Sequence, residues 1–389
     1  MRKRSKTIVL AVGGLALLST SFSAASAASA GQPCKTWKIG LEGPLTGSQS
    51  AVGIGMLNGA ILAANNVNAH GGVLGRNVQI VPIDDAANAA TGVAAATAAI
   101  KAGLDGIVGP YNSGVGGKTL PLYIKAKLVP IRLTSSTATE GLGVTLQPME
   151  SQIAPVAVTA LTTWKKAKSV AVIYDSASPY TVGVSASVVT GLQAQGVTVT
   201  AQLPITEGRS DYTSVVTQAL ASHPDAVYAA VYYPEGGLIA QEMLSGSPTT
   251  TCLADYASAS TGYAVAAGIP AAQNCPVLGV PAPNNFANSA GLVAAYTAAF
   301  KTQPGLWSPY TYDSLNLLVI AAAKAHNFQY VPLSKALFAT TGFSGWTGPA
   351  AILSPSGNRT PAPVTVDSVD ALGNLNVDLK WAAAVGYSS

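Results

Sequence analysis

The chain has 389 residues, of which 49% are hydrophobic and only 10% are charged, with 21 Lys and Arg against 17 Asp and Glu. Four of the basic residues fall within the first six positions, so the other 17 balance the 17 acids. A balanced, weakly charged chain lacks the basic patch that nucleic-acid binding needs. The length is typical of two domains, and the hydrophobic content excludes intrinsic disorder.

The first 30 residues have the features of a secretory signal peptide. Basic residues come first, an apolar run follows from Ile8 to Leu18, and small residues end in Ala28-Ser29-Ala30. This order predicts export and cleavage after Ala30. The alternative, a membrane anchor, needs about 20 apolar residues. We expect no later stretch to span a membrane, so the mature chain should be soluble and periplasmic or secreted.

Export makes disulfide bonds possible for the three cysteines. Cys252 and Cys275 are the expected pair, and closing this loop would stabilise the fold by about 3 kcal/mol. Cys34 would then be unpaired. We do not expect Cys34 to carry a lipid, because Pro33 stands where a lipobox has a small residue.

Short β-strands alternate with alanine-rich helices, which predicts an α/β fold with parallel sheets and crossover helices. The first half is expected to contain strands at 37–41, 78–83, 106–109 and 129–133, and helices at 53–68, 91–101 and 113–127. The second unit is expected to contain helices at 154–165, 180–195, 212–221 and 236–244, and strands at 169–174, 197–202, 226–231 and 250–254. The two units therefore look like tandem lobes of one architecture.

After the second unit, residues 277–283 are expected to form a strand that leaves one lobe for the other. The rest of the chain is expected to contain helices at 290–301, 313–326 and 331–340, and strands at 364–366 and 375–381.

Residues 112–119 are similar to a phosphate-binding loop, but Asn112 stands where that motif requires glycine. We favour a different ligand for the same local structure. Ser113 follows a strand and begins a helix, so free backbone N–H groups and a hydroxyl suit a carboxylate. The alternative is that Ser113 is an ordinary helix N-cap.

A hydroxyl cluster, residues 134–139, follows the next strand, and its candidate ligand contacts are Thr134, Ser135 and Ser136. In open α/β sheets, ligands bind beyond the carboxyl ends of the strands, so this cluster can donate to an oxyanion. Tyr180 and Tyr232 also lie near strand ends and would provide flat walls with polar tips. Solvated-loop and hinge-packing roles are the alternatives for these residues.

Asp255 ends another strand in an otherwise uncharged loop, which makes it a natural partner for an ammonium group. Its alternative role is a turn or a helix cap. For Asp84 and Asp85 we favour such a role, as a solvated turn or a cap of the helix near Thr91.

No catalytic constellation is present in the sequence. The histidines His70, His223 and His326 lack metal-ligand spacing, and no Gly-x-Ser-x-Gly elbow occurs. We therefore expect a binding protein and not an enzyme, with no cofactor and no metal.

Five segments resemble the leucine/isoleucine/valine-binding family of periplasmic solute receptors; they are 39–47, 68–76, 106–113, 172–175 and 232–235. The resemblance implies a type I periplasmic binding fold, with two Rossmann-like lobes joined by three crossover strands and the ligand in the interlobe cleft. The implied N-terminal lobe comprises 35–152 plus 282–352, and the implied C-terminal lobe comprises 153–281 plus 353–389.

The resemblance also implies roles for individual residues. Ser113, Thr134 and Ser136 match positions that hold the amino-acid carboxylate, whereas Tyr180, Tyr232 and Asp255 match positions around the side chain and ammonium group. Two departures bear on the ligand. The family acid is usually Glu, which is one methylene longer than Asp255, and the small pair Ala51-Val52 stands where an aromatic residue is common.

The implied function is that of a monomeric receptor of an ABC import system, which delivers an amino acid or a related small carboxylate to a membrane permease and its ATPase. Two alternatives stay open. One is a ligand sensor of the same fold that feeds a signalling partner. The other is a receptor for an aromatic or aliphatic acid without an amino group.

Overall fold

The computed structural model describes residues 36–387, apart from residue 288. The expected signal peptide, its cleavage site and Cys34 lie outside the described residues.

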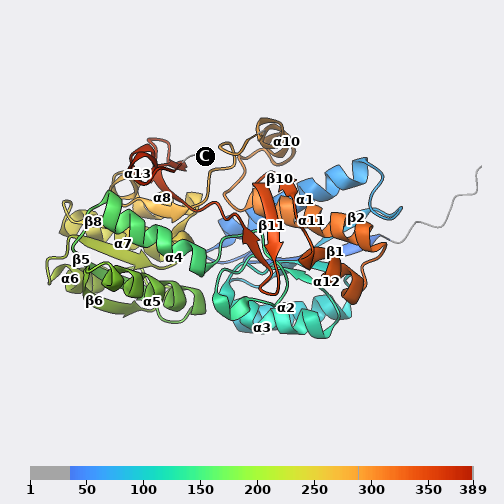
Figure 1. Cartoon of the computed structure of the whole chain (residues 1–389), viewed down its shortest axis with the longest axis horizontal. Coiled ribbons are helices and arrows are strands. Elements are labelled where there is room, and N and C mark those ends of the chain that lie inside the picture. Colours follow the sequence, from blue (N-terminus) through green and yellow to red (C-terminus); the bar gives the residue numbers. More distant parts are fainter. Residues whose placement is uncertain (1–35, 288, 388–389) are drawn as a thin grey trace, which may run out of the picture. The chain divides into compact units, whose positions relative to one another are not determined.

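The first lobe is built on a four-stranded parallel sheet in the order β2-β1-β3-β4. Its elements lie on the right of Figure 1. In chain order they are β1 (Trp37–Gly43), α1 (Ser50–Ala69), β2 (Val78–Asp84), α2 (Ala89–Lys101), β3 (Gly106–Val108), α3 (Ser113–Lys125), β4 (Pro130–Ile131) and the 3-10 turn η1 (Thr137–Thr139).

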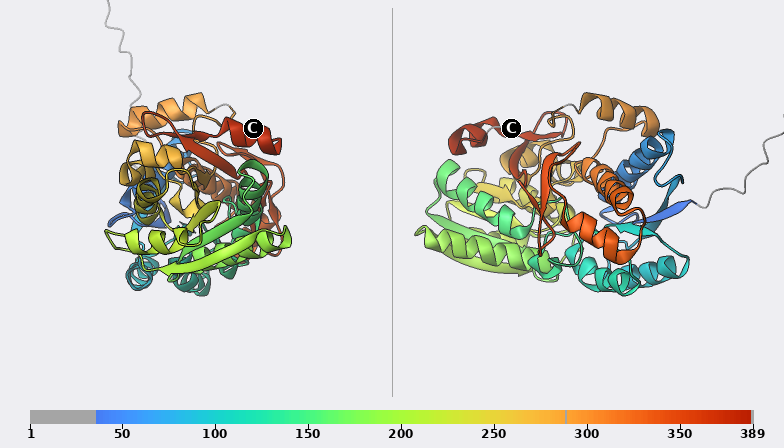
Figure 2. Two further views of the ribbon diagram at one scale, coloured as in Figure 1. Left: turned by 90° about the vertical axis from the view of Figure 1, so that its left-hand side faces the viewer. Right: turned by 45° about the vertical axis from the view of Figure 1, so that its right-hand side comes forward.

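The second lobe is built on a seven-stranded sheet in the order β14-β13-β9-β8-β7-β5-β6, parallel from β9 to β6 and antiparallel at β13 and β14. Helices pack on both of its sides (Figure 2). The elements are α4 (Glu150–Thr159), the π-helical turn η2 (Ala160–Trp164), β5 (Ser169–Asp175), α5 (Pro179–Ala194), β6 (Thr198–Ile205), α6 (Thr213–Leu220), β7 (Ala226–Ala230), α7 (Tyr233–Gly246), β8 (Thr251–Ala254), η3 (Tyr256–Ser258), α8 (Thr261–Ala267), α9 (Ile269–Asn274), β9 (Val277–Gly279), β13 (Thr365–Val369), β14 (Leu375–Val377) and α13 (Leu379–Val385).

Between β9 and β13 the chain returns to the first lobe and forms a small antiparallel sheet, β10-β11-β12. This part comprises α10 (Ala290–Phe300), α11 (Ser308–Ala325), α12 (Tyr330–Phe338), β10 (Phe343–Gly345), β11 (Gly348–Leu353) and β12 (Asn358–Thr360). Three segments therefore connect the lobes. The implied boundary at residue 353 falls inside the β11–β12 hairpin, whose end accepts backbone hydrogen bonds from the N–H groups of Gly141 and Thr145. The third connection thus follows β12.

Helix α1 has the length and mean hydropathy of a membrane span, contrary to the expectation that no segment after the signal peptide would have them. It packs against α11, with a close approach at Gly59, where a Cβ atom would lie 2.2 Å from the Ser308 carbonyl oxygen. Two hydroxyl groups of α11 also donate to α1 carbonyls, Ser308 Oγ to Gly55 at 2.8 Å and Thr311 Oγ1 to Met56 at 2.7 Å.

Two predictions made from the sequence were wrong. One concerns the last expected strand, and the other concerns Asp85, which follows β2. The strand expected at 375–381 ends at Val377, because Asp378 accepts hydrogen bonds from the Lys380 and Trp381 N–H groups and starts α13. Asp85 is fully buried and does not sit in a solvated turn, and the cap of α2 is Asn88. Burial raises the pKa of Asp85 to about 7.

The structure joins Cys252, on β8, to Cys275, which follows α9, in a disulfide bond. Both cysteines are buried. The bond therefore ties the α8–α9 segment to the central strands of the second sheet.

Replacing both Cys252 and Cys275 by Ser should lower the free energy of unfolding by about 3 kcal/mol, because the unfolded chain then regains the freedom of a 23-residue loop. Urea unfolding with and without reductant measures this. Reductant should destabilise the parent and leave the double variant unchanged; a parent that is insensitive to full reduction would contradict the assignment.

Asp367 lies in the second-lobe sheet, on β13, where it pairs with Val277 of β9. It is fully buried, and neither of its carboxyl oxygens has a hydrogen-bond partner. A Cβ atom on Gly279 would lie 2.3 Å from Asp367 Oδ2, so only glycine fits beside it. Burial raises the pKa of Asp367 to about 8.

Because an unfolded Asp titrates near pH 4, the folded chain holds a proton on Asp367 that the unfolded chain has lost between about pH 4 and 8. Stability should therefore fall across this window as pH rises. Asp367→Asn should remove a slope of about 1.4 kcal/mol per pH unit and make the variant the more stable protein at pH 8. Urea unfolding at several pH values checks this. Glu242→Gln on α7 is the control, and parallel curves for Asp367→Asn and parent would refute the prediction.

Candidate ligand-binding site

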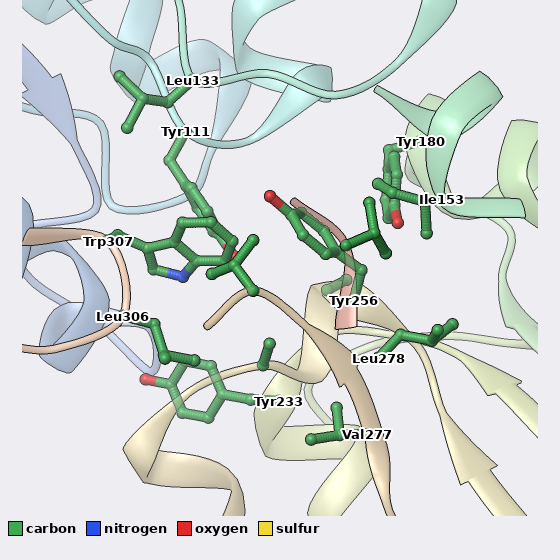
Figure 3. Close-up of a cluster of buried hydrophobic side chains, with 14 of the residues drawn as sticks. Tyr111, Leu133, Ile153, Tyr180, Tyr233, Tyr256, Val277, Leu278, Leu306 and Trp307 are labelled. Atoms are coloured by element: carbon green, nitrogen blue, oxygen red, sulfur yellow. The ribbon is translucent and has the colours of Figure 1, made fainter. Parts of the chain in front are cut away.

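Aromatic side chains from both lobes meet where the lobes come together (Figure 3). Tyr111 follows β3 and Trp307 precedes α11, and their rings lie 5.6 Å apart. From the second lobe, Tyr256 packs 5.1 Å from Trp307, and Tyr232 lies 6.3 Å from Tyr111. These rings contact one another across the interlobe cleft and fill its inner part. Their flat faces could form the walls of a solute site.

A small cavity of about 10 Å³ lies among these rings. It is lined by Tyr111, Ser113, Leu133, Ser135, Tyr180, Tyr232, Tyr256 and Ala257. This is about the space that one water molecule occupies by the same measure, so a solute of amino-acid size enters this cavity only if the rings separate. The described conformation is thus a closed one with a collapsed inner pocket.

The first lobe presents hydrogen-bond donors to the cavity. Helix α3 begins at Ser113, and its N-cap residue Asn112 makes no side-chain capping bond, so the first-turn N–H groups have no side-chain cap. Ser113 Oγ accepts hydrogen bonds from the N–H groups of Ser135 at 3.3 Å and Ser136 at 3.2 Å. The Ser113 hydroxyl hydrogen is then free to donate. This set, together with the positive end of the helix dipole, suits a carboxylate.

The second lobe presents a carboxylate directly behind the cavity. Asp255 is fully buried and accepts hydrogen bonds from the Tyr180 hydroxyl at 2.9 Å, the Ala257 N–H at 2.9 Å and the Tyr228 hydroxyl. Burial raises the pKa of Asp255, and these donors oppose the shift.

Among the residues predicted from the sequence, the structure brings four to the cavity wall: Ser113, Ser135, Tyr180 and Tyr232. The other three are not in its lining. Thr134 bonds to the Thr139 hydroxyl at 2.8 Å, Ser136 Oγ accepts from the Ala138 N–H at 3.3 Å, and Asp255 lies behind Tyr180 and Ala257.

Four aromatic residues of the site were not predicted. Tyr228 is inside the buried strand β7, where it has the sequence pattern of an ordinary core residue. Tyr111 and Tyr256 stand directly beside predicted site residues, at strand ends, and that position could have indicated them. Trp307 precedes a helix far along the chain, and no local pattern links it to the site.

A larger cleft of about 660 Å³ adjoins the cavity, and Ser113 and Tyr232 line both spaces. Its volume falls within the range of small-molecule sites. The first lobe contributes the starts of α2 and α3 and the exposed Lys118, and the second lobe contributes Asp175, Ser178 and Glu207. In residues 36–387 without 288, no group of three His, Cys, Asp or Glu side chains lies where it could hold a metal ion.

Two α/β lobes, three connecting segments and a polar, aromatic-lined site between the lobes define a type I periplasmic solute-binding protein, as the sequence predicts. The chain belongs to the periplasmic binding protein family, which matches residues 36–373. Members of this family bind small-molecule solutes outside the cytoplasm, and the class is not enzymatic.

Individual relatives agree with this assignment. The Leu/Ile/Val-binding protein BraC3 of Rhizobium johnstonii is 33% identical over 213 residues, which cover 53% of this chain and 57% of that relative, so the match spans just over half of its length. A leucine binding protein, LivK, from Thermotoga maritima superposes with a TM-score of 0.82 at 22% identity, covering 88% of this chain and 98% of that one. A solute binding protein of an ABC transporter from Rhodopseudomonas palustris, in complex with 3,4-dihydroxybenzoic acid, has a TM-score of 0.77 at 20% identity, covering 88% and 96%. At these identities, the structural likeness shows the fold.

Proposed function

We propose that this protein, after export and cleavage behind Ala30, is the receptor of an ABC importer and binds an amino acid or a related small carboxylate between its lobes. A membrane permease and its ATPase are the proposed partners. The lobes close on the solute by hinge motion, and the closed receptor then delivers it.

The observation that supports this proposal is the opposition of charge across the cleft. Uncapped N–H groups and the Ser113 hydroxyl line the first-lobe side, whereas the buried Asp255 carboxylate lies on the second-lobe side, behind Tyr180 and Ala257. Cationic side chains are not among the groups that determine the pKa of Asp255. A zwitterion would complement both sides, because its carboxylate suits the helix start and its ammonium suits the acid.

A second candidate is an aromatic acid without an amino group. Tyr111, Tyr232, Tyr256 and Trp307 surround the cavity, and Asp255 does not line it. The Rhodopseudomonas palustris relative, which is bound to 3,4-dihydroxybenzoic acid, shows that this fold accommodates such a ligand. Offset or edge-on packing of a benzoate ring against these side chains would supply its affinity.

Substitution of the first-lobe donors tests the carboxylate position. Ser113→Ala should weaken binding of leucine, or of the best carboxylate found in a thermal-shift screen, by about 1.5–3 kcal/mol, as for hydrogen bonds to a charged group. Ser136→Ala should cost less, because the Ser136 side chain stays on the Ala138 N–H. Calorimetric titration measures both variants, and an unchanged affinity of Ser113→Ala would remove this residue from the site.

Asp255→Asn tests the ammonium position. The parent should prefer leucine to 4-methylpentanoate, its analogue without the amino group, by about tenfold or more, and the variant should lose that preference. Tyr228→Phe is the matched control, since it removes one hydrogen bond to Asp255 and keeps the charge. If parent and Asp255→Asn rank the two ligands alike, Asp255 has no ammonium role. Preference of the parent for benzoates would select the second candidate.

A further inference from the structure

The loop between β1 and α1, residues 44–49, lies where the two lobes meet and is bonded to both of them. From the second lobe, the Tyr233 hydroxyl donates a hydrogen bond to the Ser48 carbonyl. Within the first lobe, the Gln49 side chain accepts a hydrogen bond from Asn112 Nδ2 at 3.0 Å. Asn112 directly precedes Ser113, which lines the inner cavity. The loop therefore connects the first-lobe wall of the candidate site to a residue of the opposite lobe.

Tyr233 is held in place by packing within the second lobe. It begins α7 and is only 5% exposed. Its ring lies against Gly262 of α8, where a Cβ atom would lie 2.5 Å from Tyr233 Cε2. The hydroxyl group is thereby directed toward the first lobe (Figure 3). Because donor and acceptor belong to different lobes, this hydrogen bond forms only when the lobes are closed.

Asp84, at the end of β2, holds the same loop from within the first lobe. Its Oδ1 atom accepts hydrogen bonds from the N–H groups of Leu45 at 2.9 Å and Thr46 at 3.2 Å, and its Oδ2 atom accepts one from the Thr46 hydroxyl at 2.6 Å. Against the effect of partial burial, these bonds and one from the Ala86 N–H lower the pKa of Asp84, which is therefore ionised at neutral pH. Hydrogen bonds to an ionised acceptor are stronger than neutral ones.

Helix α1 supports the loop from the other side. A Cβ atom on Gly53 would lie 2.1 Å from the Pro44 carbonyl oxygen and 2.9 Å from the Leu45 nitrogen, so the loop backbone rests directly on the helix. Ser48 thus lies between two fixed points, the residues that Asp84 binds and the start of α1 at Ser50. This support fixes the position of the carbonyl that Tyr233 reaches.

We propose that residues 44–49 form an interlobe latch, in which Tyr233 donates to the Ser48 carbonyl and Asp84 is the positioning residue. The latch holds the lobes closed on a bound solute and so slows its release. This inference rests on the proposed receptor function. Neither Ser48 nor Tyr233 lines the inner cavity or the adjoining cleft, so the latch sets the residence time of a solute and does not select among solutes.

The dissociation rate of leucine from the full mature chain, measured by stopped-flow fluorescence, tests the latch. Tyr233→Phe should raise this rate about two- to tenfold, as for the loss of one hydrogen bond, and leave the association rate nearly unchanged. The preference for leucine over 4-methylpentanoate should stay that of the parent. Tyr263→Phe is the matched control, because it removes a hydroxyl-to-carbonyl bond, to Cys275 at 2.7 Å, that lies inside the second lobe. It should leave the dissociation rate unchanged.

A double-mutant cycle on the same rate tests the role of Asp84. Asp84→Ala should raise the dissociation rate by a similar factor, and adding Tyr233→Phe to it should raise the rate little further, because the two residues act on one bond. Asp84→Asn should restore most of the parent rate, since the amide keeps the Oδ1 acceptor for Leu45 and Thr46. A merely structural role of Asp84 would give additive effects.

An unchanged dissociation rate in Tyr233→Phe, or an equal rise in Tyr263→Phe, would overturn the latch and leave the receptor function intact. Additive effects of Asp84→Ala and Tyr233→Phe would overturn the positioning role of Asp84. If leucine and every carboxylate of the thermal-shift screen fail to bind, the receptor proposal falls together with the latch.

Discussion

The buried carboxyl group of Asp255 constrains the arrangement of side chains at the cleft. The Asp255 carboxylate lies at the end of β8 and is held by two tyrosine hydroxyls and a backbone N–H. Burying an isolated carboxylate is costly unless hydrogen bonds or an opposite charge offset the loss of hydration. The tyrosine hydroxyls supply part of that offset. Through its hydrogen bond to Asp255, Tyr228, a strand residue that touches no cavity, is tied to the candidate site.

Aromatic side chains connect Asp255 with the contacts between the two lobes. Tyr180 donates to Asp255 and also lines the cavity, and the ring of Tyr256 spans to Trp307 on the other lobe. The Tyr233 hydroxyl donates to the Ser48 carbonyl across the same junction. These contacts stabilise the closed arrangement of the lobes. A solute must therefore bind well enough to offset the separation of the rings, and its apparent affinity includes that cost.

Most of the fold could be predicted because its signals are local. Strand and helix periodicity identified the main elements of both lobes, and the resemblance supplied their connections. The errors occur where a single side chain overrides the pattern, as at Asp378, which starts a helix inside an expected strand. The strands of the small antiparallel sheet β10-β11-β12 show no strong periodicity in the sequence, and they were not predicted.

The site was predictable only in part, because only some of its residues have a local signal in the sequence. Ser113 and Asp255 follow strands, and a strand end can be recognised along the chain. Trp307 and Tyr228 meet the candidate site only through tertiary packing, so no spacing in the sequence reveals them. The orientation of Asp255, behind Tyr180 and not in the cavity wall, likewise depends on contacts between distant segments.

A crystal structure of the mature protein with a bound carboxylate solute would test the central claim most directly. The opposed charges predict that the solute carboxylate lies within hydrogen-bond distance of Ser113 Oγ and the first turn of α3, with its cationic end toward Asp255 of the second lobe. A solute bound outside the interlobe cleft, or bound with its carboxylate toward Asp255, would contradict it.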